Sequence, residues 1–301
     1  MTWTAYGVSF RLLSPMHIGW HKLGNLQQTR PYITGRSLWG ALTARLTRDF
    51  GRGNYKDIGR EVDSHLAFTY FYPYALPEED SPWSRPEQWH DFLWPWSDRD
   101  KFTWTFLGSY ASTSLTNGHN AETGSLHETE FIAPRTRDGR QVYLVGYIFE
   151  TAGLHNEKQN PLSRWQSVLD RLQLGGERGY GWGRVRLQEC CKKINNGKCF
   201  DYKWLPENAR PQLQALGDTH LLAHTHAVTD SASNRKVTIE PLIGRETTAH
   251  TSFGNYIADA AICWVPGGKV EKNETFQIQP KGIWECFPPS NPTLKQGTSE
   301  T

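Results

Sequence analysis

The spacing of apolar residues predicts a strand followed by a helix at the start of the chain. In residues 5–13, apolar side chains occupy every second position from Val8 to Leu12, a period that is typical of a half-buried strand. In residues 36–51, leucines recur every four positions and Gly51 marks an end, which is typical of an amphipathic helix. Between the two, residues 16–35 are predicted to form a loop.

The middle of the chain alternates between regular and irregular segments. Residues 52–65 have a polar, helical composition, residues 66–74 are rich in β-forming side chains, and residues 102–107 are predicted to form a further strand. Residues 75–100 are dense in Pro, Trp and acidic side chains without periodicity, so we expect an irregular insertion there. Residues 112–123 are rich in Ser, Thr, Asn and Gly and are expected to be mobile.

A hairpin and a second helix are predicted before residue 190. Residues 128–132 and 141–150 flank an arginine-rich segment in which Asp138-Gly139 is a turn signal. Residues 160–174 begin with Asn-Pro, which suits a helix start, and are predicted to form the best-defined helix of the chain. Its apolar stripe consists of Leu162, Trp165, Val168, Leu169 and Leu172. A strand is expected to follow at residues 183–187.

These elements, taken in order, give the pattern βαββαβ of a ferredoxin-like (RRM-like) domain. We therefore predict an α+β protein in which residues 1–190 form this domain, with an insertion near residues 75–125. Residues 191–287 contain several short candidate strands and are predicted to form a mostly β C-terminal region. The polar tail, residues 288–301, is predicted to be disordered.

Composition limits the function classes that the chain allows. The 301 residues carry a formal net charge of +2, so a surface that binds a polyanion must be a local patch. No apolar run is long enough for a membrane span and the start lacks a signal-peptide pattern, so we expect a cytoplasmic protein.

The five cysteines lack a repeated CxxC spacing. The histidines His220, His224 and His226 lie in a predicted strand without a third ligand on one side, so neither a metal site nor a cofactor is predicted.

The densest candidate chemistry lies in residues 174–187, which read LGGERGYGWGRVRL. Glycines allow positive φ angles, and consecutive exposed N–H groups in such a loop bind anions. Arginines add positive charge, and aromatic rings offer faces on which bases stack. We therefore predict contacts to a phosphate-bearing chain with unpaired bases, such as RNA, from Gly175, Gly176, Arg178, Tyr180, Trp182 and Arg184. The alternative is a glycine-rich turn that only closes a helix-to-strand connection.

The loop after the first strand and the helix start that follows it form the second candidate binding segment. Its candidate residues are His17, Trp20, His21, Lys22, Arg30, Tyr32, Gly35, Arg36 and Ser37. Free N–H groups at the start of a helix favour a bound anion. Because the first and last strands are neighbours in a ferredoxin-like sheet, we expect this segment and the glycine-rich loop to form one surface.

Two segments together resemble the CRISPR-associated RAMP superfamily. Residues 32–37, YITGRS, with Gly40 are similar to the entry into the first helix of that family, with Thr34 where proline is usual. The glycine-rich loop before the last strand is the second point of similarity. The resemblance implies a subunit of a type III (Csm, Cmr or III-D-like) effector complex that binds guide RNA (crRNA). Its implied partners are backbone RAMP subunits, a large polymerase-like subunit and target RNA, with no membrane.

The resemblance also narrows the role within such a complex. Backbone subunits that cut target RNA carry an aspartate in the loop before this motif, whereas this chain has Asn25, Gln27 and Gln28 there and no acidic residue before Arg48. We therefore predict a subunit without catalytic residues, most like the capping subunit that holds the 5′ repeat-derived tag of the guide. The alternatives are a backbone subunit, a scaffold, and a metal-independent endoribonuclease that processes precursor crRNA with His17 or His21.

Overall fold

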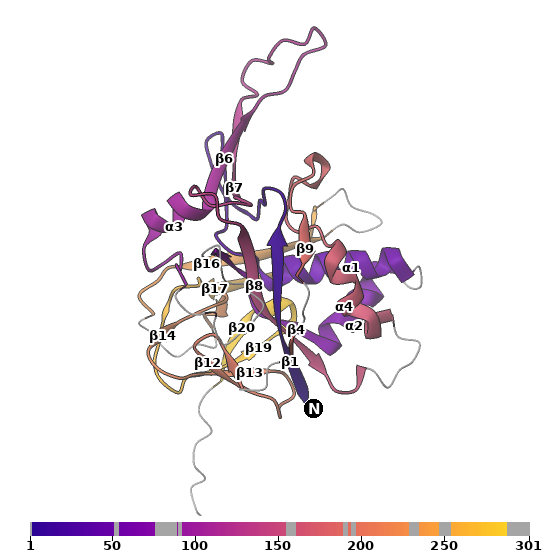
Figure 1. Cartoon of the computed structure of the whole chain (residues 1–301), viewed down its shortest axis with the longest axis vertical. Coiled ribbons are helices and arrows are strands. Elements are labelled where there is room, and N and C mark those ends of the chain that lie inside the picture. The colour runs from indigo at the N-terminus through magenta and orange to yellow at the C-terminus, as the bar shows by residue number, and fades with distance from the viewer. Residues whose placement is uncertain are drawn as a thin grey trace, which may run out of the picture.

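A central antiparallel sheet organises the fold, which is that of a computed structural model (Figure 1). The structure describes residues 2–50, 54–75, 89, 92–154, 161–188, 192–193, 197–228, 235–246 and 254–287. The strands of the sheet are β1 (Trp3–Leu12), β4 (Leu66–Phe68), β5 (Tyr72–Ala75), β8 (Val142–Thr151), β9 (Val185–Leu187) and β10 (Lys192–Lys193). β1 and β8 are paired along their length, with β9 and β10 beside β1 and with β4 and β5 beside β8.

The topology of this sheet confirms the ferredoxin-like prediction. In chain order, β1 leads through α1 (Gly35–Phe50) to β4 and β5, then to β8, and through a helical segment to β9. In space, the order is β9, β1, β8, β4, and the pairings are antiparallel. The last βαββαβ strand therefore lies beside the first, as the sequence pattern predicts.

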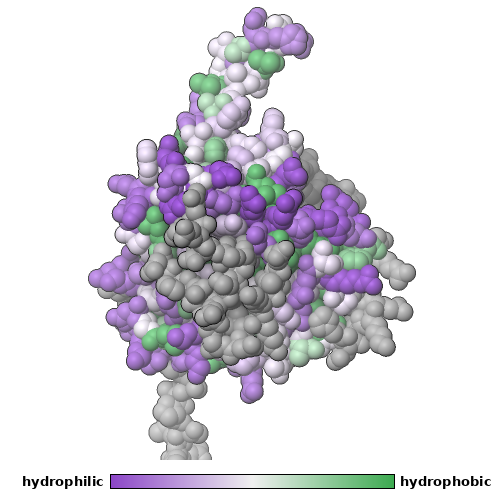
Figure 2. All heavy atoms as spheres, in the orientation of Figure 1, coloured by the Kyte–Doolittle hydropathy of each residue, from purple (hydrophilic) through white to green (hydrophobic). Residues whose placement is uncertain are grey.

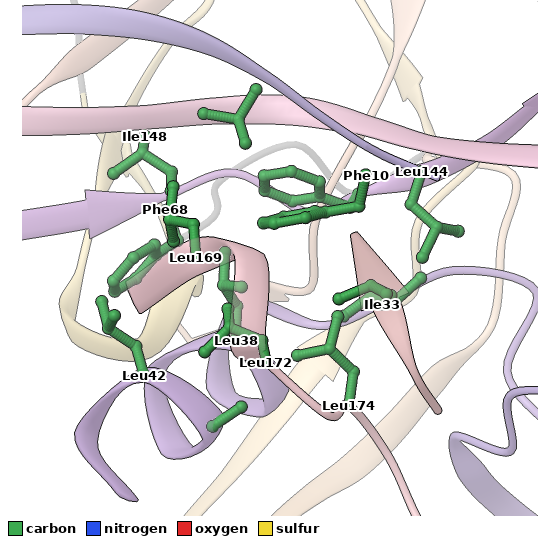
Figure 3. Packing of buried hydrophobic residues seen from close by; sticks show 14 of the residues in the cluster. Phe10, Ile33, Leu38, Leu42, Phe68, Leu144, Ile148, Leu169, Leu172 and Leu174 are labelled. Carbon is green, nitrogen blue, oxygen red and sulfur yellow. The ribbon is translucent and has the colours of Figure 1, made fainter. Parts of the chain in front are cut away.

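The helices pack on one face of the sheet and enclose the first of two cores. α1 and α2 (Tyr55–His65) contact each other, and the apolar stripe of α1 faces the sheet. Figure 3 shows Leu38 and Leu42 of α1 pointing toward Phe10 and Ile148 of the sheet. This burial of apolar side chains supplies the main stabilisation of the domain.

The predicted helix of residues 160–174 was wrong as one continuous α-helix. It consists of η3 (Pro161–Arg164), α4 (Trp165–Val168) and η4 (Leu169–Arg171). The buried residues Leu162, Trp165 and Val168 recur every three positions, the period of a 3₁₀-helix rather than of an α-helix. The predicted stripe is nevertheless buried. Asn160, the predicted cap, lies outside the described residues.

A second sheet forms an arm that projects from the body (Figure 1). Its order is β2 (Gly19–Leu23), β3 (Leu26–Thr29), β7 (His127–Ile132) and β6 (Leu107–Ser112). The loop predicted at residues 16–35 thus contains a hairpin, which turns at Gly24 with φ +58°. A turn with Asn25 after a glycine suits such a tight connection.

Two other local predictions in this region were wrong. Residues 102–107 lie largely in α3 (Arg99–Phe106), because Asp98 caps the helix and Phe102 and Phe106, four positions apart, are buried together. β7 pairs with β6 and β3, whereas β8 belongs to the central sheet, so residues 128–132 and 141–150 do not form a hairpin with each other. The turn at Gly139 between them is present, with φ +90°.

The C-terminal region is a β structure, as predicted. Its eight-stranded sheet has the order β11 (Lys198–Cys199), β12 (Tyr202–Leu205), β13 (Gln212–Ala215), β19 (Thr275–Ile278), β20 (Trp284–Phe287), β15 (Thr225–His226), β17 (Tyr256–Trp264) and β16 (Ile239–Glu246). β14 (Thr219–His220) pairs separately with β18 (Lys269–Val270), and η6 (Pro280–Gly282) precedes β20. Residues 201–217 contain β12 and β13, which form a short antiparallel ladder, and Tyr202 and Trp204 of β12 are buried at alternate positions.

The C-terminal sheet packs on the face of the central sheet that the helices leave open. The second core joins Trp3 and Phe149 of the central sheet to Tyr202, Phe276 and Trp284. The division of the chain at residue 190 stays a prediction, since both regions contribute to this core. The tail from residue 288 lies outside the described residues. None of the helices in the described ranges is long and apolar enough to span a membrane.

Candidate nucleic-acid interface

The loop after β1 and the glycine-rich loop before β9 pack directly against each other. The Gly176 N–H donates to the His17 carbonyl at 2.8 Å, and the Gly183 N–H donates to the Pro15 carbonyl at 2.7 Å. Gly175 has φ +81°, and a Cβ at this position would lie 2.3 Å from the His17 carbonyl oxygen. Glycine is required here because only glycine permits this approach at a positive φ. The two segments that the topology predicted to be neighbours are therefore in contact.

The glycine-rich loop presents Arg178 and Tyr180 to solvent. It turns through η5 (Arg178–Tyr180), which is flanked by Glu177 at φ 54° and Gly181 at φ 81°. The Gln173 side-chain amide donates to the Arg178 carbonyl at 3.1 Å and so fixes the turn. Tyr180 is 83% exposed. Arg178 forms no salt bridge with any residue in the described part of the chain, so its charge is available to an external anion.

Both loops line one cleft with a volume of about 970 Å³. Its lining comes from the glycine-rich loop, from the first loop with the start of α1, and from β16 and β17 of the C-terminal sheet. The predicted contacts that line the cleft are Trp20, His21, Arg30, Arg36, Ser37, Gly175, Gly176 and Arg178. Those that do not are His17, Lys22, Tyr32, Gly35, Tyr180, Trp182 and Arg184.

Arg36 lines the cleft, but the C-terminal hairpin already neutralises it. Its guanidinium donates to Glu246 at 3.0 Å and to Asp259. It packs closely against Gly244 of β16, where a Cβ would be 2.3 Å from the guanidinium carbon. Lys281 donates to Asp259 at 2.6 Å. Arg36 therefore joins α1 to β16 and β17, and its role as a phosphate contact stays a prediction.

The start of α1 is capped from within the chain. The Ser37 N–H donates to the Thr34 hydroxyl at 3.3 Å and to the Thr34 carbonyl at 3.0 Å. A threonine in this position acts as an N-cap. A glycine is required at residue 35 by close packing, because a Cβ there would lie 2.7 Å from the Cα of Gly282 in η6. The predicted anion site at the helix start is thus partly occupied by the protein itself.

Glu240 of β16 is the centre of a buried polar network that sequence analysis missed. Its carboxylate accepts from Arg30 at 2.6 Å, lies 2.7 Å from His224 Nε2, and accepts from the Trp20 indole at 3.0 Å. Burial alone would raise the pKa of Glu240, but these donors and the Arg30 charge hold it at about 2. No local sequence signal could have revealed Glu240, because its partners are brought to it by tertiary packing.

His224 belongs to the same network, and Tyr32 is buried beside it. Burial lowers the pKa of His224, whose other ring nitrogen lies 2.7 Å from the Tyr70 hydroxyl. Burial also raises the pKa of Tyr32, which is 6% exposed and packs against the Tyr70 ring at 5.5 Å. These residues are part of the structure between the two sheets. In the described part of the chain, no three His, Cys, Asp or Glu side chains are grouped as metal ligands.

The remaining candidates are spread around the cleft. His17 is buried, with Nδ1 2.8 Å from the Glu130 carbonyl. Trp182 packs edge-on against Phe131 at the base of the arm, with ring centroids 5.2 Å apart. Lys22 is exposed on β2, and Arg184 is exposed where the glycine-rich loop enters β9. None of these side chains lines the cleft.

The arrangement offers charge and stacking surfaces side by side. Trp20, 38% exposed, packs against the His21 ring at 4.5 Å, and the indole is held by its hydrogen bond to Glu240. Arg178, which has no salt-bridge partner among the described residues, supplies a cation to the same cleft. A pre-oriented aromatic face and a guanidinium that line one cleft suit a single-stranded nucleic acid better than a small neutral ligand.

Comparison with known proteins identifies the family. The family model described as the RAMP superfamily matches residues 9–186. No curated protein matches the chain's sequence. Three chains of Type III-B Cmr-beta solved by cryo-EM are similar in structure. One, bound to cognate target RNA, has a TM-score of 0.39 at 12% identity and covers 61% of this chain and 96% of that chain.

The two other structures give comparable values. Cmr-beta bound to cognate target RNA and AMPPnP gives a TM-score of 0.46 at 11% identity, covering 88% of this chain and 86% of that chain. The apo state gives a TM-score of 0.38 at 12% identity, covering 64% of this chain and 98% of that chain. The assignment depends on the family model, which spans more than half of the sequence and includes both contacting loops. The chain belongs to the RAMP superfamily.

Proposed function

We propose that this chain is a non-catalytic RNA-binding subunit of a type III CRISPR antiviral ribonucleoprotein complex. The cleft supports the proposal, because the two loops that resemble RAMP motifs meet there beside Arg178, which has no salt-bridge partner in the described part of the chain. The occupant is crRNA, and the partners are the other subunits of the effector complex, with target RNA beside the guide.

The geometry divides the predicted RNA contacts into two groups. Arg178 holds a phosphate, while the exposed rings of Tyr180 and Trp20 stack on bases. Arg30 and Arg36 are bound to carboxylates and instead hold the walls of the cleft together. The affinity for RNA therefore depends more on the glycine-rich loop than on the start of α1.

A role at the 5′ repeat-derived tag or the adjacent guide backbone, rather than in cutting, is supported by the acids near the cleft. Residues 25–28 carry no carboxylate, and Gln27 and Gln28 lie in β3. Glu240 does enter the cleft, but its oxygens already accept from Arg30 and Trp20. A carboxylate occupied in this way is poorly placed to orient a metal ion or an attacking hydroxyl.

Ultraviolet crosslinking of the protein in its native complex tests the proposal. We expect nucleotide adducts on the peptide with Tyr180 and on the peptide with Trp20, because these rings are exposed beside the cleft. Mass spectrometry identifies the adducts. Purification of the complex without RNA, or adducts confined to peptides outside both loops, would contradict the proposal.

One observation favours a second candidate, a metal-independent endoribonuclease. His21 is exposed, and its Nε2 lies 3.9 Å from Glu240, so a histidine beside a carboxylate faces the cleft. His17, in contrast, is buried against a backbone carbonyl and is not placed to act on RNA. Such a histidine can serve as a general base on a 2′-hydroxyl.

Incubation of the purified protein with a hairpin repeat RNA and EDTA separates the two functions. The proposed function predicts no specific product. A product that the exposed control variant His119→Ala still forms and that His21→Ala loses would instead establish the nuclease.

A further inference from the structure

The strand β6 forms an open edge of the arm sheet. It pairs with β7 along the whole of Leu107–Ser112 without a bulge, and no strand of the described residues pairs with its other side. Ser109, Tyr110 and Ala111 are exposed, and Figure 1 shows β6 and β7 extending away from the body. Figure 2 shows hydrophobic side chains among hydrophilic ones along this arm. The backbone of β6 is therefore accessible from outside.

The hydrogen bonds of β7 show which backbone groups of β6 point to the open side. The Glu128 N–H donates away from β6, to the Asn25 carbonyl at 2.9 Å. Ala111 lies opposite Glu128, and in an antiparallel ladder the two residues of such a pair both turn their N–H and C=O groups outward. Ser109, two positions earlier, has the same orientation. On the open side, these groups of Ser109 and Ala111 have no partner in the described ranges.

This edge lacks the features that protect two other edge strands. The sequence of β6, LGSYAS, contains neither a charged residue nor a proline. At the opposite edge of the same sheet, β2 carries Lys22, and its register shifts between Gly19 and Lys22. In the C-terminal sheet, the edge strand β16 contains Pro241 and a register shift after Gly244. Charges, prolines and bulges prevent a further strand from pairing, so β6 remains able to accept one.

The two faces of the sheet beside this edge differ in chemistry. Tyr110 lies on one face with Phe131, and Trp182 packs edge-on against both rings at centroid distances of 6.5 Å and 5.2 Å. On the other face, Ala111 lies opposite Glu128, whose carboxylate has no salt-bridge partner in the described part of the chain. The small side chain of Ala111 leaves this carboxylate within reach of a strand beside β6. One face is therefore aromatic and the other acidic.

A cavity with a volume of about 300 Å³ extends the acidic face toward α3. Its lining includes Ser109 of β6, Asp100 and Trp104 of α3, Glu130 of β7 and Arg137. The Arg137 guanidinium lies over the Trp104 ring, 4.2 Å from its centroid. Two carboxylates and one guanidinium give the cavity a net negative charge, which suits a long basic side chain.

These features favour a protein strand as the occupant. A strand beside β6 pairs with the outward backbone groups, and its side chains alternate between the two faces. Basic residues two positions apart then reach Glu128 and the cavity, while the apolar residues between them cover Tyr110. An RNA chain would instead bring its phosphates next to these carboxylates. A second copy of β6 would supply no cation and would place two acidic faces side by side.

We propose that the β6 edge binds an extended segment of a partner protein, in which basic and apolar residues alternate, as an additional strand of the arm sheet. Backbone hydrogen bonds to Ser109 and Ala111 hold the segment, and Glu128 pairs with one of its basic side chains. No residue of β6 lines the cleft, so the inference goes beyond the proposed RNA-binding function and does not depend on it.

Fluorescence anisotropy tests this edge with a labelled peptide of about ten residues in which lysine and valine alternate. We expect the full-length protein to bind the peptide and Ala111→Pro to bind it about tenfold or more weakly, because proline removes an N–H that the added strand needs. Glu128→Lys should weaken binding by about fivefold or more and should instead prefer a peptide of alternating glutamate and valine. The charge-matched control Glu271→Lys, at an exposed position of the C-terminal region, should behave as wild type.

Thermal unfolding of the same variants separates binding from folding. Because Ala111 is exposed and its N–H points outward, Ala111→Pro should melt within a few degrees of the wild type. If this variant melts much lower, Glu128→Lys decides, and an unchanged preference for the lysine peptide overturns the inference. Wild-type affinity in both variants would mean that the peptide binds elsewhere, which also overturns it. So would a wild type that binds no lysine peptide at about 1 mM or binds both peptides equally.

Discussion

At the scale of single residues, Glu240 links the two regions that form the cleft. It belongs to β16, yet its partners Arg30 and Trp20 belong to the first loop and His224 precedes β15. The side chain is 10% exposed, so its charge is stabilised by these donors rather than by water. Removing the charge leaves Arg30 buried without its counter-ion.

We predict that Glu240→Gln lowers the free energy of unfolding by about 2–4 kcal/mol at pH 7. Chemical denaturation measures the change, and Glu271→Gln at an exposed position is the control. The pKa of Glu240 lies at about 2, below its usual 4.5, so its contribution is complete above pH 4.5 and is lost as pH falls toward 2. The difference in the free energy of unfolding between wild type and variant should therefore become smaller in acid. A difference that does not change with pH would show that the charge of Glu240 does not stabilise the fold.

At the scale of elements, the glycines of the glycine-rich loop differ in whether the structure around them leaves room for a side chain. Gly175 and Gly183 combine positive φ angles with backbone contacts too close for a Cβ, whereas Gly179 has no atom within 4 Å of an added Cβ. The first two glycines therefore fix the fold of the loop against residues 15–17. Gly179 lies in η5, on the exposed turn between Arg178 and Tyr180.

This difference gives a matched pair of variants. Gly175→Ala should destabilise the protein by about 2 kcal/mol or more and weaken RNA binding, because the added Cβ displaces the His17 carbonyl. Gly179→Ala should change stability by less than about 1 kcal/mol. Thermal unfolding and RNA titration of both variants check the pair. Equal effects of the two substitutions would mean that contact with His17 does not set the position of the loop.

Elements in which apolar residues recur with a regular period could be predicted from the sequence, and elements that depend on tertiary contacts could not. The leucines of α1 and the alternation in β1 were sufficient for both elements and for the ferredoxin-like order. Phe102 and its aromatic neighbours have β-forming composition, but the Asp98 cap and burial on one side make α3 a helix. Propensity was a weaker signal than capping in this segment.

At the scale of the whole molecule, the C-terminal region completes the second core and also forms one side of the cleft. The contact between the two loops could be predicted from the sequence because it follows from the topology alone. The ion pairs of Arg36 could not be predicted, because its acidic partners Glu246 and Asp259 lie more than two hundred residues away in the chain. Charges that neutralise one another through tertiary packing leave no trace in local sequence.

The salt dependence of RNA affinity tests the central claim most directly. Titration of a single-stranded RNA with wild type, with Arg178→Ala/Tyr180→Ala and with Lys272→Ala measures Kd at each salt concentration. If the glycine-rich loop grips RNA beside the cleft, the double variant should bind about tenfold or more weakly, with a slope reduced by about 0.7 for one lost phosphate contact, while the lysine variant behaves as wild type. Identical affinities and slopes for all three proteins would contradict the account.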